Sequence, residues 1–212
     1  MTTTEEKTDI IDTKKKSILL ITIAIVFSLL ITLLAVSIYQ HGNLPPIGNR
    51  VVQNVTYIIM LGGTFLLMKV SGKQFREYGL FREKPMRQIL IGFAISGIAL
   101  MLFFVMGWRP SAKESICYLI LSQILVGFSE ELLFRGLILT LMRDIVKNTN
   151  QAVVLTAVLF GVWHFPISHS VSHVVSACLI GAVYGALRTA LDDDVIGIPS
   201  LAIAHCIWNV MI

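Results

Sequence analysis

Long apolar stretches separated by short polar segments run along most of this chain. They cover residues 18–39, 52–70, 88–107, 116–142, 151–167, 172–188 and 195–212. Each is near the ~20 residues that a helix needs to cross a lipid bilayer. Helix-breaking prolines fall at or near the ends of these stretches, as at Pro45, Pro110 and Pro199. The pattern therefore predicts an all-α fold, a polytopic transmembrane helical bundle of about seven spans, within a range of about six to eight.

The composition agrees with a membrane protein. Of the 212 residues, 55% are hydrophobic and 14% are charged, whereas a soluble domain has about 25% charged residues. The first apolar stretch is too long for the core of a signal peptide, so we expect a retained span. The polar residues 1–13 predict a disordered cytoplasmic tail. Residues 14–212 are expected to form a single transmembrane domain with no internal repeat.

Basic residues are distributed unequally between the two faces that seven spans would create. Only Arg50, Arg109 and Lys113 fall on one face, and the other basic residues fall on the face of the N-terminus. Because cytoplasmic loops carry the excess of Lys and Arg, this asymmetry predicts a cytoplasmic N-terminus. Residues 72–85 mix aromatic and basic side chains, which suits either an interfacial helix or an ordinary basic loop. The basic residues give no nucleic-acid signature.

The fourth stretch contains charged residues at membrane depth, where each costs roughly 2.5–3.5 kcal/mol on insertion scales. They are Glu130, Glu131 and Arg135. Glu131 and Arg135 are four residues apart, so they share a helix face and can pair. Glu130 points about 100° away and needs another partner. We therefore expect Glu131 and Arg135 to support the site and Glu130 to be available for chemistry.

Two later stretches supply the remaining polar groups. His164 lies in the fifth, and His205 and Asn209 lie four residues apart in the seventh. Glu130 would take a proton from water, and His164 would help to hold that water. His205 and Asn209 would donate hydrogen bonds to a developing oxyanion. The same Glu130, His164 and His205 could instead bind zinc, although the HExxH motif is absent. No cofactor is certain from these residues.

Other polar residues carry weaker signals. His169 and His173, also four apart, could bind a metal but are more typical of a loop. Gly181 and Gly185 form a GxxxG pair, which favours close helix packing. Asp192–Asp194 is typical of a solvated turn before the last span.

Three motifs in this order resemble those of the CPBP family, the CAAX-prenyl-protease and bacteriocin-processing intramembrane peptidases, also called Abi proteins. The motifs are Glu130-Glu131-x-x-x-Arg135, Phe160-x-x-x-His164 and His205-x-x-x-Asn209. The resemblance covers about residues 115–212, which we take as a peptidase core. It implies a CAAX-prenyl-protease-like fold, with water activated by Glu130 and His164 and an oxyanion hole formed by His205 and Asn209.

The resemblance implies an intramembrane endopeptidase, either metal-dependent or glutamate-dependent. Its substrate would be a membrane-embedded or lipidated protein or peptide, and its location a bacterial plasma membrane. The alternative is a non-catalytic scaffold or bacteriocin self-immunity protein of the same fold. A small transporter would show polar residues along a path and repeat symmetry, whereas the polar residues here are concentrated in the C-terminal half. The sequence leaves the oligomeric state and the substrate unknown.

Overall fold

The computed structural model describes residues 4–80, 84–105, 107, 116–190 and 195–211, and this part of the chain is helical with no strand. The predicted turn Asp192–Asp194 and the basic residues Arg82, Arg109 and Lys113 lie outside the described residues. The elements, in order, are α1 (Thr4–His41), α2 (Pro46–Ser71), α3 (Pro85–Val105), α4 (Ile116–Glu131), the π-helix η1 (Leu132–Ile138), α5 (Leu139–Ile145), α6 (Thr149–Ser168), α7 (Val171–Ala190) and α8 (Ile198–Met211).

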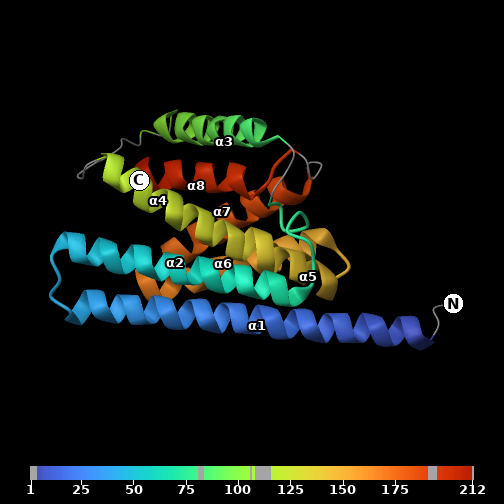
Figure 1. Ribbon diagram of the computed structural model, residues 1–212. Helices are drawn as coiled ribbons and strands as arrows, with labels where there is room; N and C mark the ends of the chain where they lie inside the picture. Colours follow the sequence, from blue (N-terminus) through green and yellow to red (C-terminus); the bar gives the residue numbers. More distant parts are fainter. Residues whose placement is uncertain (1–3, 81–83, 106, 108–115, 191–194, 212) are drawn as a thin grey trace.

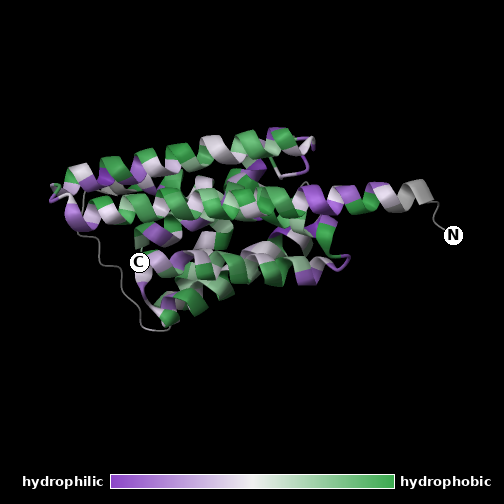
Figure 2. Cartoon of the chain, turned by 90° about the horizontal axis from the view of Figure 1, so that it is seen from below, coloured by the Kyte–Doolittle hydropathy of each residue, from purple (hydrophilic) through white to green (hydrophobic). Residues whose placement is uncertain are grey.

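Five of the described helices are long and apolar enough to cross a membrane: α1, α2, α3, α6 and α7. The residues flanking η1 keep helical backbone angles, so α4, η1 and α5 form one continuous helical segment. With this segment and the shorter apolar helix α8, the fold agrees with the prediction of an all-α bundle of about seven spans. Large apolar side chains such as Leu30, Leu66 and Leu179 are exposed, and the hydropathy colouring in Figure 2 shows hydrophobic residues along all the long helices.

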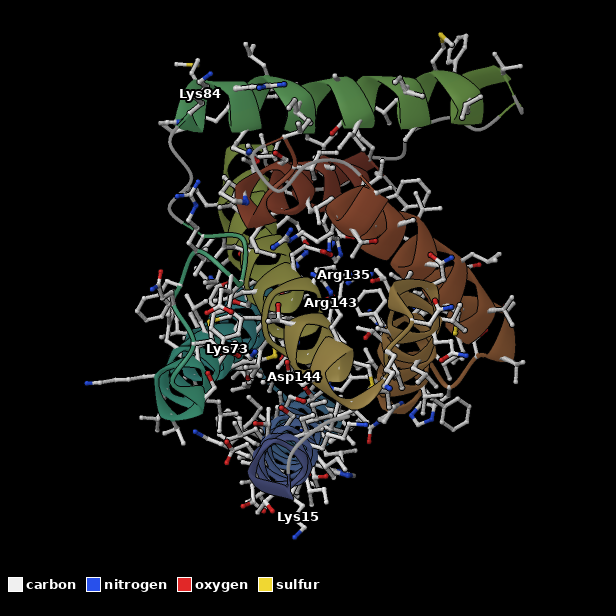
Figure 3. All side chains as sticks on the ribbon, turned by 90° about the vertical axis from the view of Figure 1, so that its right-hand side faces the viewer. Lys15, Lys73, Lys84, Arg135, Arg143 and Asp144 are labelled. Atoms are coloured by element: carbon white, nitrogen blue, oxygen red, sulfur yellow. The ribbon has the colours of Figure 1, made fainter. Side chains whose placement is uncertain are left out.

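The helices run between two ends of the molecule (Figure 1). The N-terminus, the segment between α2 and α3, the α5–α6 turn and the start of α8 lie at one end. We call this the basic end, because Lys15, Lys73, Lys84 and Arg143 gather there (Figure 3). The α1–α2 turn, the α6–α7 turn and the last turn of α8 lie at the opposite end.

The N-terminal segment differs from the predicted disordered tail, because α1 begins at Thr4. Charged residues in this part tolerate helical geometry well, and Lys15 pairs with Asp12 at 3.7 Å, one turn away. The first turns of α1 extend beyond the rest of the bundle (Figure 1). Their helical form is therefore a continuation of the first span.

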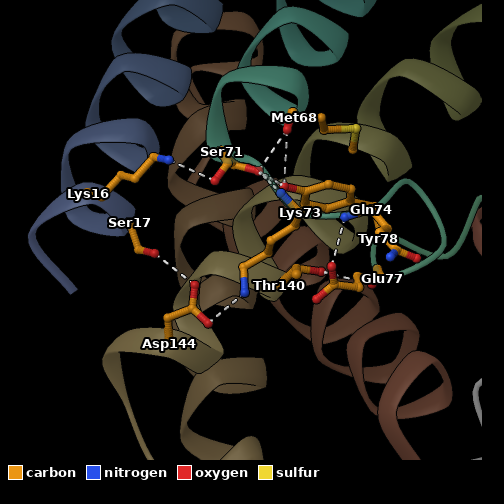
Figure 4. A network of polar contacts seen from close by, with 10 residues as sticks. All are labelled: Lys16, Ser17, Met68, Ser71, Lys73, Gln74, Glu77, Tyr78, Thr140 and Asp144. Carbon is orange, nitrogen blue, oxygen red and sulfur yellow. Dashed lines mark hydrogen bonds and ion pairs between the residues drawn. The ribbon is translucent and has the colours of Figure 1, made fainter. Parts of the chain in front are cut away.

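The segment after α2 is a folded loop over residues 72–80, so the interfacial-helix alternative is wrong for this part. Two of its apolar side chains turn inward, since Tyr78 is 0% exposed and Leu80 is 3% exposed, whereas Phe75 is 39% exposed. The Tyr78 hydroxyl lies in hydrogen-bond contact with Ser71 Oγ, and burial raises the pKa of Tyr78. Beside this loop, Lys73 Nζ lies 3.0 Å from Asp144 in α5 (Figure 4). Packing against protein thus takes the place of packing against lipid headgroups.

Small residues bring α6 and α7 into close contact, as the GxxxG pair predicts. A Cβ on Gly181 would lie 3.3 Å from Cα of Ala157, and one on Gly185 would lie 2.9 Å from Val153. Gly161 of α6 is the tightest position, since a Cβ there would lie 2.1 Å from Cys178 Sγ. The backbones can approach this closely only because these side chains are absent.

Candidate active site

The two glutamates lie at the end of α4, where the backbone changes to the π-helix η1. Glu130, Glu131 and Arg135 are 3%, 0% and 1% exposed, so all three charged groups are inside the bundle. Single π-helical turns within α-helices are rare and frequently occur at functional sites. The local backbone and the buried charges therefore mark the same place.

Glu130 has a different environment at each carboxylate oxygen. Its Oε1 accepts a hydrogen bond of 2.7 Å from the hydroxyl of Tyr57, which comes from α2. Its Oε2 lies 3.7 Å from Nε2 of His164 and 3.7 Å from Nε2 of His205. Oε2 is buried and accepts no hydrogen bond from a protein group. One oxygen is thus held in place, and the other faces two imidazoles.

Both histidines are oriented through their other ring nitrogen. Nδ1 of His164 lies 2.8 Å from the carbonyl oxygen of Phe160, and a carbonyl can only accept, so Nδ1 carries the proton. Nδ1 of His205 lies 2.8 Å from Oε1 of Glu131. Contacts of this kind fix the direction of an imidazole ring. In both residues they turn Nε2 toward Glu130.

Glu131 and Arg135 form the ion pair that their spacing predicts, with 3.2 Å between Arg135 Nη1 and Glu131 Oε1. The guanidinium carbon also lies 4.0 Å from the ring centroid of Phe160, a cation–π contact. Glu131 therefore connects Arg135 to His205, and Arg135 packs on the residue whose carbonyl holds His164. The pair supports the orientation of both histidines.

A cavity of about 270 Å³ adjoins these groups. It is lined by side chains of α6, α7 and α8: Phe160, His164, His173, Ser176, Ala177, Ile180, Tyr184, His205, Trp208 and Asn209. Asn209 thus shares the cavity with both histidines. Its Nδ2 donates a hydrogen bond of 3.0 Å to Gln123 Oε1, and the second hydrogen of this amide is available for another acceptor.

Sequence reasoning missed Tyr57 as a residue of this site and gave His173 only a weak signal. Tyr57 lies in an apolar run of α2, where a tyrosine is typical of ordinary packing, so no local signal distinguishes it. His173 is typical of a loop by sequence, but it lies in the first turn of α7, and its ring centroid is 5.5 Å from that of His164. Only its four-residue spacing from His169 hinted at a role, and His169 instead ends α6 in a left-handed conformation.

Within the described part of the chain, no group of three or more His, Cys, Asp and Glu side chains has an arrangement that could hold a metal ion. The zinc set Glu130, His164 and His205 stays a prediction. The donor types suit zinc, and the test below includes a chelator for this reason.

Comparison with known families gives one match. The sequence model described as type II CAAX prenyl endopeptidase Rce1-like matches residues 112–211. The matched part contains all three motifs and the elements from α4 to α8. No curated protein and no solved structure matches the chain.

Proposed function

We propose that this chain, which belongs to the Rce1-like family of type II CAAX prenyl endopeptidases, hydrolyses a peptide bond of a membrane-associated protein or peptide. Its apolar helices make it a multi-pass membrane protein. In this proposal Glu130 is the general base, His164 positions the water, and His205 and Asn209 stabilise the oxyanion. Glu131 and Arg135 keep these groups in position.

The observation that carries the proposal is the position of Glu130 Oε2, 3.7 Å from the Nε2 atoms of His164 and His205. Polar atoms at this separation are suited to a water molecule that contacts more than one of them. His164 Nδ1 bonds to a carbonyl, so a neutral His164 offers an acceptor at Nε2. A water held there lies beside the carboxylate that would deprotonate it.

The chemical step then balances within the site. Glu130 takes the proton of the water as its oxygen attacks the peptide carbonyl carbon, and the same proton is passed to the departing amine when the carbon–nitrogen bond breaks. The oxyanion formed in between would accept hydrogen bonds from Asn209 Nδ2 and His205 Nε2. For this, His205 needs protons on both nitrogens. Glu131 Oε1 lies 2.8 Å from Nδ1 as the acceptor for one proton, and the negative charge of Glu130, 3.7 Å from Nε2, favours the other.

A comparison of peptide cleavage by the Glu130→Gln variant and by the unsubstituted chain tests this proposal. Purified protein in detergent would be incubated with peptides derived from membrane proteins, and Glu77→Gln would serve as the control for a glutamate in the loop outside the site. We expect Glu130→Gln to lose cleavage at least a hundredfold, within the ~10²–10⁴-fold that general bases contribute. Equal activity of Glu130→Gln and the unsubstituted chain would contradict the mechanism and favour the non-catalytic scaffold or self-immunity alternative.

A chelator separates the two forms of the mechanism. Activity that persists after incubation with a strong chelator supports the metal-free, glutamate-dependent form. Loss on chelation and recovery with added zinc supports a site in which Glu130, His164 and His205 hold the ion. Bound zinc would supply a Lewis acid and a more acidic water. The substrate, a lipidated or membrane-embedded protein, and the location in a bacterial plasma membrane remain part of the proposal.

A further inference from the structure

We infer that the catalytic cavity opens at the end of the bundle opposite the basic end, so that the substrate peptide reaches Glu130 from the extracytoplasmic side of the membrane. The inference rests on the proposed function for the chemistry of the site. The direction of the opening follows from the positions of its floor and its mouth.

Helix geometry gives the depth of the site. An α-helix rises 1.5 Å per residue, so His164 lies about 6 Å from the last residue of α6, Ser168, but about 22 Å from its first, Thr149. Asn209 lies two residues before the end of α8. Both of these helix ends are at the opposite end of the molecule (Figure 1). Two of the proposed site residues are therefore close to that surface.

An apolar cluster closes the cavity toward the basic end. Tyr184 of α7 packs with Leu201 and Ala204 of α8 and with Ile196 just before α8, and these residues are at most 7% exposed. Tyr184 also lines the cavity. The cluster fills the space between α7 and α8 on the basic side of His205, so it forms the floor.

The 72–80 loop adds a second layer beneath this floor. The backbone N–H of Ile198 donates to the carbonyl of Gly79 at 3.1 Å, and Arg188 Nη2 donates to the carbonyl of Glu77 at 3.2 Å. These bonds hold the loop across the starting end of α8 and the last turn of α7. A peptide approaching from the basic end would have to displace both the loop and the cluster.

The mouth of the cavity lies at the other end. His173 and Ser176, in the first two turns of α7, are exposed and line the cavity, and Trp208 and Asn209 line it from α8. The described lining residues include no Asp, Glu, Lys or Arg. Phe160, Ala177, Ile180, Tyr184 and Trp208 give the cavity apolar walls, which suit a largely apolar peptide segment near the membrane surface.

The distribution of Lys and Arg identifies the side of the membrane on which the mouth of the cavity lies. At the basic end the described residues include the following: Lys14, Lys15, Lys16, Lys69, Lys73, Arg76, Lys84, Arg87, Arg143, Lys147 and Arg188. Among the described residues of the opposite end, Arg50 is the only Lys or Arg. The excess of Lys and Arg marks the cytoplasmic face. The mouth therefore faces away from the cytoplasm.

Cysteine labelling in intact cells tests the orientation. Ser172→Cys places a thiol in the exposed first turn of α7, beside the mouth, and Lys15→Cys places one at the basic end, where the side chain is 74% exposed. The unsubstituted chain gives the background from Cys117, Cys178 and Cys206. We expect a membrane-impermeant maleimide to label Ser172→Cys in intact cells and Lys15→Cys only after permeabilisation. The reverse pattern would overturn the inference.

A blocking experiment tests entry itself. A maleimide carrying a polyethylene glycol chain, attached to Ser172→Cys, should lower the cleavage rate at least tenfold relative to the same variant without label, whereas the same label on Lys15→Cys should change the rate less than twofold. Unchanged cleavage by labelled Ser172→Cys would refute entry through this mouth. Labelling reports the orientation whether or not Glu130→Gln abolishes cleavage, so failure of the proposed function and failure of this inference can be told apart.

Discussion

At the scale of single residues, Tyr57 decides how Glu130 is placed. Its hydroxyl donates a hydrogen bond of 2.7 Å to Oε1 of Glu130, which leaves Oε2 as the oxygen that faces the two histidines. Tyr57→Phe keeps the ring but removes this bond, whose loss should cost about 1.5–3 kcal/mol for a charged acceptor. We expect kcat/KM to fall roughly tenfold to a hundredfold. Steady-state cleavage measures this, and a change below twofold would show that Tyr57 does not position the base.

The buried ion pair of Arg135 and Glu131 should matter more for stability than the more accessible pair of Lys73 and Asp144. Arg135 and Glu131 are 1% and 0% exposed, whereas Lys73 and Asp144 are 25% and 17% exposed. Removing one partner of a buried pair costs about 3–5 kcal/mol, because the other charge is left alone. Removing a partner of a more accessible pair costs about 1 kcal/mol or less.

The expected result is a clearly lower midpoint of thermal unfolding for Arg135→Gln and a small shift for Lys73→Gln. Both variants would be measured in the same detergent. Equal shifts would mean that water or lipid headgroups compensate the charge of Glu131, and the supporting role of the pair would have to be abandoned.

The site residues that could be predicted from sequence alone are the charged ones, because a charged side chain at membrane depth costs free energy and therefore needs an explanation. Glu130, Glu131 and Arg135 interrupt an apolar span, and the pairing of Glu131 with Arg135 follows from helix spacing alone. Tyr57 could not be found in this way, because a tyrosine costs little in an apolar helix and its partner is 73 residues away. Contacts between distant helices leave no periodic signal in one sequence.

At the scale of elements, the contact between α6 and α7 sets the position of His164. A Cβ on Gly161 would lie 2.1 Å from Cys178 Sγ and 2.7 Å from the carbonyl of Val174. Gly161→Ala must therefore push the helices apart. Such overpacking typically costs about 1–3 kcal/mol of stability. Here it should also move the imidazole of His164, three residues after Gly161, away from Glu130.

Gly62 of α2 offers a matched control, since a Cβ there would meet nothing within 4 Å. Alanine at an open helix position should be neutral or stabilising by about 0.5–1 kcal/mol. We expect Gly161→Ala to lower both the unfolding temperature and the cleavage rate, and Gly62→Ala to lower neither. If the two variants behave alike, the α6–α7 contact does not hold the site.

The existence of the helices was easier to predict than their local form. Apolar stretches of sufficient length predicted the spans, but nothing in the composition of residues 132–138 indicates a π-helix. The loop over residues 72–80 was ambiguous for a related reason. Tyr78 and Leu80 among basic residues suit either a membrane surface or a protein surface, and only the packing of α2, α7 and α8 around them decides between the two.

At the scale of the whole molecule, the two ends differ in function as well as in charge. Basic residues and a folded loop occupy one end, and the mouth of the cavity occupies the other. The sequence predicted the asymmetry of charge, because it depends only on the order of spans. It could not predict where the cavity opens, since this depends on how Tyr184, Leu201 and Ala204 fill the space between α7 and α8.

The closure of the basic end depends on Gly79. This residue has φ +83°, and a Cβ would lie 2.8 Å from Nε of Arg188. Gly107 has φ +87° with nothing within 4 Å of an added Cβ. Alanine at either position bears the cost of left-handed backbone, about 1–2 kcal/mol. Only Gly79→Ala should also displace Arg188 and weaken the hydrogen bond between Gly79 and Ile198.

We therefore expect the larger loss of unfolding temperature for Gly79→Ala, together with faster hydrogen exchange at the amide of Ile198. Equal losses in the two variants, with unchanged exchange, would mean that the loop lies on the bundle without closing it, and the cavity would then be accessible from both faces.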